Sequence, residues 1–351
     1  MNETITTSRQ KYILNIINQS EGINRKDIQN KTATLYPVSK PTLIRDLNVL
    51  IKQKLIIAKG SAKSTTYFSK TASPLLREFD LERYFAEGPD TRTQGAVPYD
   101  FGVIEQFRDL FTKHELLLLT NNTSNFSQKT AYLAPEMLKK ELERFVIELS
   151  WKSSHIEGNT YTLLETESLI LQQKEAAGKS NHETTMILNH KKAFSEILNM
   201  ANEFRSLSTA HVITIHSLLT RGLQIARGLR SQPVGITGTT YEPLDNKHQI
   251  TDALEKMVVC INNTNNPFEK ALIAHFMIAY IQPFTDGNKR TARMVTNAIL
   301  LAHDLLPLSY RSVDEDLFKK ALILFYEQHS IVDIKKLFIE QVLFANKTYF
   351  R

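Results

Sequence analysis

The stretch that decides the fold of this chain is IQPFTDGNKRTAR, at residues 281–293. An apolar run at 268–280 precedes it and another follows at 290–301, so the stretch joins two predicted helices. Gly287 and Asn288 form a turn at the start of the second helix, where free backbone N–H groups and the helix dipole favour an anion. We therefore expect an anion-binding nest at this turn.

Three charged side chains around the turn predict the kind of anion. Arg290 and Arg293 are three residues apart, which places both guanidinium groups on adjacent parts of one helix face. Guanidinium forks bind phosphate oxygens with two hydrogen bonds at once. Asp286 offers the hard oxygen ligand that Mg²⁺ between phosphates requires. The residues alone thus indicate a site for phosphates and magnesium.

The segment resembles the signature of the Fic family, His-Pro-Phe-x-(Asp or Glu)-Gly-Asn-x-Arg-x-x-Arg, at every fixed position except the first. The resemblance implies a domain that binds ATP and Mg²⁺ and transfers AMP to a Ser, Thr or Tyr hydroxyl of a target protein. It also implies that Asp286 holds the metal, that the Gly-Asn turn holds the α-phosphate, and that the two arginines hold the β and γ phosphates. The expected ATP-binding residues are Gly287, Asn288, Lys289, Arg290 and Arg293.

Gln282 stands where the family has the histidine that takes the proton from the attacking hydroxyl. An amide donates and accepts hydrogen bonds but is not a base near neutral pH. Loss of such a base lowers a rate by about 10²–10⁴. His275 lies about two helical turns earlier on the same side, and we do not expect it to replace the base. The sequence leaves open whether Gln282 is natural or a substitution introduced into an active enzyme.

Residues 153–158, SSHIEG, resemble the family's inhibitory motif, (Ser or Thr)-x-x-x-Glu-(Gly or Asn), at the end of an amphipathic helix. The motif residues are Ser153, Glu157 and Gly158. In family members with this arrangement the glutamate pairs with the last arginine of the signature, here Arg293, and keeps it from the γ-phosphate. A Glu–Arg pair can also serve only to join two helices. We predict autoinhibition by Glu157, and the purely structural role is its alternative.

Residues 234–242 combine β-branched side chains with glycines, which predicts a short β-hairpin. The run Thr239-Thr240-Tyr241 and the preceding run at 228–230 resemble the family's flap, and His216 resembles a histidine of its core helix. The resemblance implies that a target peptide aligns with the flap by strand addition.

The first 70 residues are basic, with 12 Lys and Arg against 4 Asp and Glu; this net +8 leaves −2 for the rest of the chain. Such a basic segment indicates a polyanionic partner. Apolar spacing predicts helices at 8–19 and from Ser39, with a short helix capped by Asn24 between them. Two short strands are predicted at 55–59 and 65–68.

Three helices followed by two strands resemble a winged helix-turn-helix. In that family the third helix enters the major groove of DNA and the wing lies near phosphates. Lys54 departs from the family, which often has a glycine there. Domains of this kind also serve only in dimerisation or protein docking, and this alternative stays open. The expected DNA-binding residues are Lys40, Thr42, Arg45, Lys59 and Lys63.

We predict a mainly α fold, in which a helical Fic-type domain with a short β-hairpin flap follows a small α+β winged helix-turn-helix domain. The chain has no run of 18 apolar residues and its start, MNET, is polar, so we expect a cytoplasmic protein without a membrane partner. The expected ranges are 1–70 for the winged domain, 71–110 for a connector, 111–160 for a helical region with the inhibitory helix, 161–335 for the Fic core and 336–351 for the C-terminal segment.

The main functional prediction is a protein adenylyltransferase that is autoinhibited and inactive or impaired as written. One alternative is a DNA-binding transcription regulator whose Fic-like domain senses a nucleotide without catalysis. Another is removal of AMP from a modified protein, with Glu157 positioning a water, as in some family members. The sequence does not reveal the target protein, the DNA site or the oligomeric state, and a homo-oligomer stays open.

Overall fold

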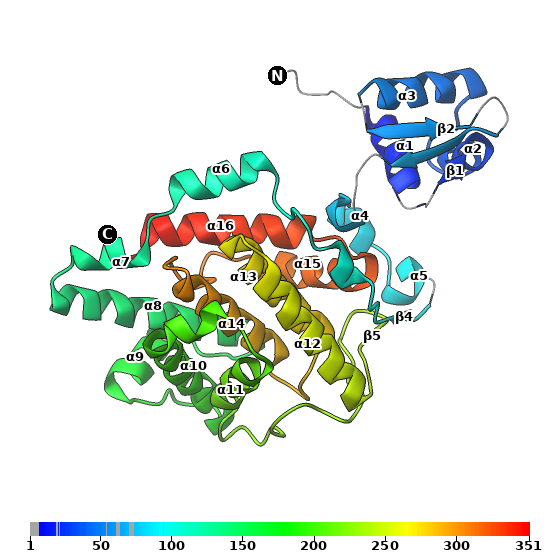
Figure 1. The fold of residues 1–351 in the computed structure, drawn as a ribbon. Coiled ribbons are helices and arrows are strands. Elements are labelled where there is room, and N and C mark those ends of the chain that lie inside the picture. Colours follow the sequence, from blue (N-terminus) through cyan, green and yellow to red (C-terminus); the bar gives the residue numbers. More distant parts are fainter. Residues whose placement is uncertain are drawn as a thin grey trace. The chain divides into compact units, whose positions relative to one another are not determined.

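The computed structural model describes residues 7–18, 20, 22–53, 55–60, 64–69, 74–93 and 95–351. Contacts divide the chain into two units, each of which is drawn in Figure 1. The first contains the described residues up to Ala86 together with Gln328–Val332, and the second contains Glu87–Glu327 and Asp333–Arg351. Most described residues are helical and few form strands, as the sequence predicts.

The first unit combines helices with a small antiparallel sheet whose strand order is β1-β3-β2. Asn24 and Ser39 cap the second and third helices as predicted, because their side chains accept hydrogen bonds from Asp27 N at 3.0 Å and Thr42 N at 3.4 Å. Its main elements are α1 (Ser8–Asn18), β1 (Ile23–Asn24), α2 (Arg25–Ala33), α3 (Lys40–Lys52), β2 (Ile56–Lys59) and β3 (Thr66–Ser69). The core contains Ile13, Ile16, Ile17, Ile28, Leu43, Leu47, Leu50, Ile56 and Tyr67.

Short elements follow the sheet and lead into the second unit. They are η2 (Pro74–Leu76), α4 (Leu81–Phe85), α5 (Pro89–Thr93), β4 (Val97–Pro98), η3 (Val103–Gln106), α6 (Lys113–Asn122) and α7 (Phe126–Ala131). The longer helices are α8 (Pro135–His155), α9 (Leu163–Gln172), α10 (Asn181–Asn199), α11 (Thr209–Leu219), α12 (Lys247–Asn263), α13 (Pro267–Ile281), α14 (Asn288–Ala302), α15 (Glu315–Gln328) and α16 (Val332–Thr348), with η4 (Ala201–Arg205) before α11. In the described part of the chain, no helix has the length and hydropathy needed to cross a membrane.

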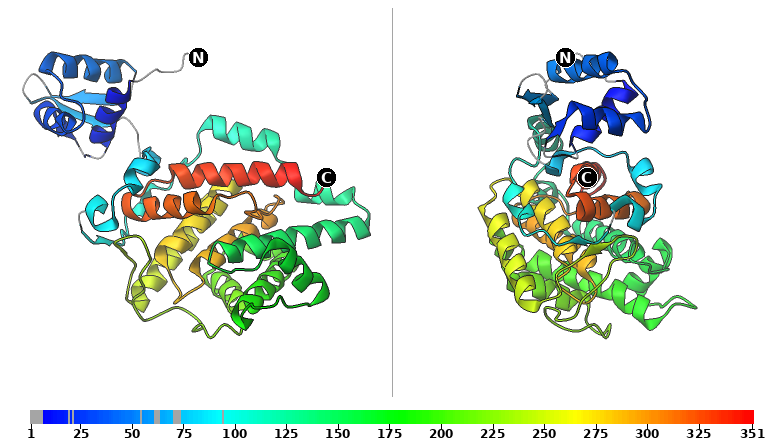
Figure 2. Two further views of the ribbon diagram at one scale, coloured as in Figure 1. Left: turned by 180° about the vertical axis from the view of Figure 1, so that it is seen from behind. Right: turned by 90° about the vertical axis from the view of Figure 1, so that its right-hand side faces the viewer.

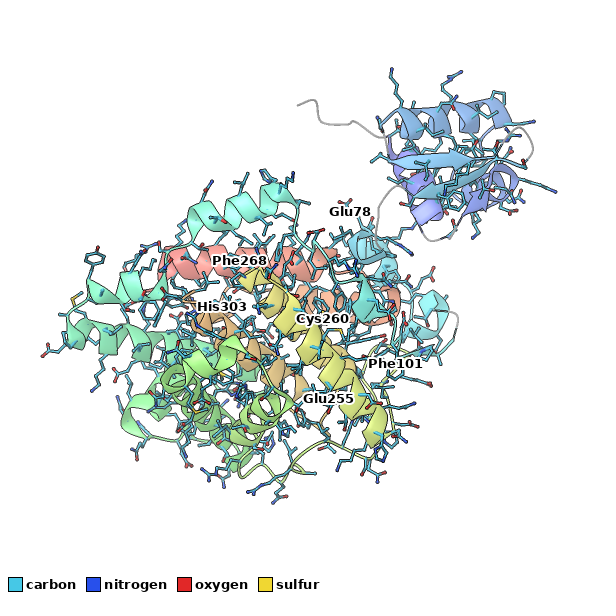
Figure 3. All side chains as sticks on the ribbon, in the orientation of Figure 1. Glu78, Phe101, Glu255, Cys260, Phe268 and His303 are labelled. Carbon is cyan, nitrogen blue, oxygen red and sulfur yellow. The ribbon has the colours of Figure 1, made fainter. Side chains whose placement is uncertain are left out.

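The antiparallel pair α13 and α14 lies at the centre of the second unit. From Phe268 to Ile281 every side chain of α13 except that of Glu269 is buried, which suits a helix that is apolar on all sides. α14 packs along α13 and also contacts α8, α10 and α11, while α12 packs on α13. Figures 1 and 2 show α13 and α14 side by side, and Figure 3 labels Phe268 and His303 at the end of the pair farthest from the connecting loop.

The segment 234–242 differs from the hairpin predicted for it. Its strand, β5 (Tyr241–Glu242), pairs in parallel with β4, so the partner comes from residues far away in sequence. Thr93 and Val97 supply the bonds: Val97 N donates to Thr240 O at 3.1 Å, and the hydroxyls of Thr93 and Thr240 lie 2.7 Å apart. Because the backbone of β5 already pairs with β4, its hydrogen-bonding groups have partners without a second strand from residues 234–242.

Candidate functional site

The loop between α13 and α14 is held in shape by its own side chains. Gln282 ends α13 with a φ of 50°, and Gly287 precedes α14 with a φ of 81°. The Asn288 amide accepts a bond from Phe284 N at 2.9 Å and donates to Phe284 O at 2.8 Å and to Gln282 Oε1 at 2.9 Å. These bonds hold the loop in shape without a ligand.

Gly287 is required at its position for two reasons. Its positive φ disfavours any residue with a Cβ, and an added Cβ would lie 3.1 Å from Thr220 Cγ2. Because glycine has no side chain to cap α14, the first N–H groups of the helix are left to a ligand. The start of α14 therefore has the backbone geometry that an anion-binding nest requires, with the helix dipole behind it.

The Gln282 side chain is engaged at both ends. Its Nε2 donates to Ala279 O at 2.6 Å and its Oε1 accepts from Asn288, and the residue is 7% exposed. Arg230 fixes the backbone here, since its Nε donates to Gln282 O at 2.7 Å and its N to Pro283 O at 3.0 Å. A neutral amide held in this way cannot take a proton from a substrate hydroxyl.

His216 supports the loop from α11. Its ring stacks on Phe284 with 3.6 Å between centroids, and its Nε2 lies 3.0 Å from Asp286 O. Burial lowers the pKa of His216 to about 4, although the bond to Asp286 opposes this effect. The ring is thus neutral near pH 7 and donates from Nε2, since a carbonyl only accepts.

Asp286 and Arg290 meet at the edge of the nest. Arg290 Nη2 lies 3.2 Å from Asp286 Oδ2, and Asp286 Oδ1 accepts a bond from Gly287 N. The Asp286 side chain is 65% exposed whereas that of Arg290 is 2% exposed. One exposed carboxylate beside a phosphate nest fits Mg²⁺, which is commonly bound through one or two carboxylates and the phosphates of its substrate.

Arg293 is held by the last turn of α8 and by the turn that follows it. Its Nε donates to Ser153 Oγ at 2.9 Å, and its Nη2 donates to Ser153 O at 2.8 Å and to Glu157 Oε1 at 2.9 Å. Burial raises the pKa of Glu157, but the positive charges of Arg293 and Lys289 outweigh it and leave the pKa below its usual value. Glu157 is therefore an anion at neutral pH, and Lys289 Nζ lies 3.9 Å from its Oε2.

A cleft of about 420 Å³ opens in front of the nest. It is bordered by the loop, by the turn after α8, by α15 and by the segment 234–237. Arg290 and Arg293 are 2% and 1% exposed, so the packing of α14 buries both guanidinium groups behind the cleft. The lining residues are Glu157, Val234, Gly235, Ile236, Thr237, Gln282, Thr285, Asp286, Gly287, Asn288, Lys289, Lys319, Leu322, Ile323 and Tyr326.

The predicted flap residues lie elsewhere, against the connector, α13 and α15. Thr239 Oγ1 donates to Glu327 Oε1 at 2.6 Å, and Thr240 Oγ1 donates to Gly95 O at 2.9 Å. Tyr241 is 3% exposed and its hydroxyl donates to Tyr280 O at 2.7 Å. Residues 234–237, rather than 239–241, therefore line the cleft.

The predicted DNA-binding residues belong to the first unit. Lys40 and Arg45 are exposed on α3, while Thr42 is half-buried and its hydroxyl lies 2.9 Å from Ser39 Oγ. Lys59 is exposed at the end of β2, with its Nζ 5.2 Å from the centre of the Phe68 ring. Lys63, like Lys54, lies outside the described residues.

Two buried residues of the site were missed as site residues by the sequence analysis. Arg230 fixes the backbone of Gln282 and Pro283, and His190 on α10 contacts Ser153 Oγ through Nε2 at 2.9 Å. Neither has a local signal, because each acts through a residue far away in sequence. His275, weighed as a substitute base, is instead a core residue whose Nδ1 lies 3.2 Å from Thr296 Oγ1 and 3.3 Å from the Tyr310 hydroxyl.

Comparisons with known proteins agree with this architecture. Residues 206–300 match the model of the Fic/DOC family. The chain is 27% identical over 181 residues to the protein adenylyltransferase Fic of Nematostella vectensis, an alignment that covers 50% of this chain and 42% of that relative. The chain thus spans less than half the length of this relative.

Solved structures share the fold. Fic-1 from C. elegans superposes with a TM-score of 0.59 at 17% identity, covering 92% of this chain and 91% of that one. A Fic domain containing signaling protein from Bacteroides thetaiotaomicron superposes with a TM-score of 0.55 at 20% identity, covering 64% of this chain and 94% of that one. The family match at 206–300 and these two superpositions make this part of the chain similar to Fic/DOC domains.

Proposed function

We propose that this chain is a Fic-type protein adenylyltransferase scaffold that binds ATP and Mg²⁺, is autoinhibited by Glu157, and is inactive or impaired because Gln282 occupies the position of the base. The observation that carries the proposal is the uncapped start of α14 at Gly287, whose nearby arginine, Arg293, is bound by Glu157. The relative with the matching sequence is named a protein adenylyltransferase, which supports this class of reaction.

The nest and the buried arginines support a triphosphate ligand. In the proposed pose, Gly287 and Asn288 hold the α-phosphate, and Arg290 and Arg293 hold the β and γ phosphates. Asp286 and phosphate oxygens would hold Mg²⁺, which supplies charge neutralisation on the phosphates. The attacking group would be a Ser, Thr or Tyr hydroxyl of a target protein, aligned along residues 234–237 at the border of the cleft.

The contacts of Arg293 support the proposed autoinhibition. A guanidinium whose Nε and Nη2 are bound to Ser153 and Glu157 cannot point the same N–H groups at a γ-phosphate. Purely structural joining of α8 to α14 is the competing account. The two accounts differ in what happens to nucleotide affinity when Glu157 is removed.

We expect Glu157→Gly to bind MgATP about tenfold more tightly than the unaltered chain. A freed arginine gains a charge-assisted hydrogen bond to phosphate, worth about 1.5–3 kcal/mol, and 1.4 kcal/mol corresponds to a factor of ten. Isothermal titration calorimetry measures the two dissociation constants. Glu157→Gln, which keeps the shape and removes the charge, is the matched control and should give a smaller gain. Equal affinities in all three proteins would leave Glu157 with a structural role only.

A second candidate function rests on the first unit. We infer that residues 1–70 form a winged helix-turn-helix, which would make the chain a DNA-binding regulator whose Fic/DOC domain senses a nucleotide. The supporting observation is that Lys40 and Arg45 are exposed on α3, the third of three helices packed with an antiparallel sheet. Exposed cations on such a helix suit contacts with DNA phosphates or base edges.

We expect a double Lys40→Ala and Arg45→Ala variant to bind DNA more weakly and with a shallower salt dependence. Each lost phosphate contact lowers the slope of log K against log salt by about one, so the slope should fall by about two. Electrophoretic mobility with random duplex DNA over a salt series measures this. Lys26→Ala with Lys31→Ala removes the same charge from exposed positions on α2 and is the control. Equal DNA affinity and equal salt dependence of the two double variants would exclude α3 as the helix that contacts DNA.

A further inference from the structure

His190 lies behind the contact that holds Arg293, on α10. The imidazole is fully buried, with its Nδ1 2.8 Å from Met186 O and its Nε2 2.9 Å from Ser153 Oγ. The same Ser153 Oγ accepts the bond from Arg293 Nε at 2.9 Å. Ser153 therefore stands between the histidine and the arginine.

The chemistry of these groups fixes the direction of each hydrogen bond in the series from Met186 through His190 and Ser153 to Arg293. A backbone carbonyl only accepts, so His190 Nδ1 carries the proton that Met186 O receives. The other nitrogen, Nε2, is then bare and only accepts, so the Ser153 hydroxyl must donate to it. Because the hydroxyl proton of Ser153 is donated to His190 Nε2, its Oγ accepts the hydrogen bond from Arg293 Nε. Ser154 Oγ, 3.4 Å from His190 Nδ1, shares the same N–H.

The neutral form of His190 is the one that the site stabilises. Burial lowers the pKa of His190 to about 3, and the positive charges of Arg290 and Arg293 act in the same direction. An imidazolium would donate from Nε2 and turn the Ser153 hydroxyl away from the histidine. Between pH 5 and 8 the ring therefore stays an acceptor for Ser153.

We propose that His190 is a positioning residue of the autoinhibited state, which acts through Ser153 to hold the Arg293 guanidinium against Glu157 and away from the γ-phosphate. This inference rests on the proposed function, because it assigns a consequence for nucleotide binding to the Ser153–Arg293 contact. Ser153 holds the arginine by its hydroxyl at 2.9 Å and by its backbone carbonyl at 2.8 Å, and His190 orients the first of these two groups.

The test uses the ratio of the dissociation constants for MgADP and MgATP in the full chain, measured by calorimetry. Only a contact with the γ-phosphate changes this ratio, whereas a general loss of structure weakens both nucleotides alike. His190→Phe keeps a ring of similar size and removes both nitrogens. One lost hydrogen bond is worth about 0.5–1.5 kcal/mol, so we expect the ratio to rise about two- to twelvefold in favour of ATP.

His190→Gln is the conservative control. Its amide oxygen accepts from Ser153 and its NH₂ donates to Met186 O, so the ratio should stay within about twofold of the unaltered chain. Thermal melts followed by circular dichroism report whether each variant is folded. Glu157→Gly serves as the reference for a freed arginine.

A raised ratio in His190→Phe and Glu157→Gly, but not in His190→Gln, supports the inference. A raised ratio in Glu157→Gly alone leaves the proposed function standing and overturns the role of His190. An unchanged ratio in Glu157→Gly contradicts the autoinhibition itself, and the inference falls with it.

Discussion

The double variant Gln282→His with Glu157→Gly should transfer AMP from ATP to protein, at a rate about 10²–10⁴ above that of Glu157→Gly alone. The gain is that of a general base positioned beside the attacking hydroxyl. Histidine tolerates the left-handed backbone of position 282, whose φ is 50°. Arg230 holds the carbonyl of this residue, so the backbone should stay in place after the substitution.

Incorporation of label from α-labelled ATP into the chain itself or into lysate proteins measures this transfer. Gln282→His alone should be much less active than the double variant, since Arg293 is still bound by Glu157. Arg290→Ala in the double variant is a further control that removes a phosphate contact and keeps the base. A folded double variant that incorporates no label would contradict the proposed AMP transfer. It would not contradict nucleotide binding by the same cleft.

Removal of the Arg92 side chain should lower the free energy of unfolding of the second unit by about 3–5 kcal/mol. Arg92 binds Glu327 through two nitrogens, at 2.8 Å and 2.9 Å, and the side chains of the pair are 6% and 0% exposed. Breaking one partner of a buried pair leaves the other charge desolvated without its counter-ion, and the bond from Thr239 to Glu327 replaces none of the lost positive charge. Arg92 Nη2 also donates to Gly238 O, so Arg92→Ala should loosen the segment before β5 as well.

Urea denaturation followed by tryptophan fluorescence suits this measurement, because the single tryptophan, Trp151, lies in α8 of the second unit. Lys320→Ala is the matched control on α15, the helix that carries Glu327. Its pair with Asp316 is 34% and 74% exposed, and such pairs are worth about 0–1 kcal/mol. A midpoint for Arg92→Ala as high as that of Lys320→Ala would show that the buried pair adds nothing.

The centre of the site could be predicted from the sequence because its information is local. Gly287 and Asn288 specify the turn, and the apolar runs on either side specify α13 and α14. The capping residues Asn24 and Ser39 likewise gave the starts of two helices in the first unit. In each case a few neighbouring residues determine the backbone through sterics and hydrogen bonds.

What the sequence could not provide depends on contacts between distant residues. The strand partner of β5 is β4, more than a hundred residues earlier, and no local pattern at 234–242 names it. The burial of Arg290 and Arg293 also follows from packing, since the helix pattern alone places both on an accessible face. The pairing of Glu157 with Arg293 was predicted only through the resemblance, and His190 was not predicted as a site residue.

The central claim is that the start of α14, with Arg290, Arg293 and Asp286, is a cradle for a magnesium triphosphate. Titration of MgATP into Glu157→Gly by calorimetry tests it most directly, with the same variant carrying Gly287→Ala as the control that fills the nest with a Cβ. The account predicts saturable binding of one nucleotide per chain, lost in the Gly287→Ala control. A folded Glu157→Gly protein that gives no heat of association with MgATP would contradict it.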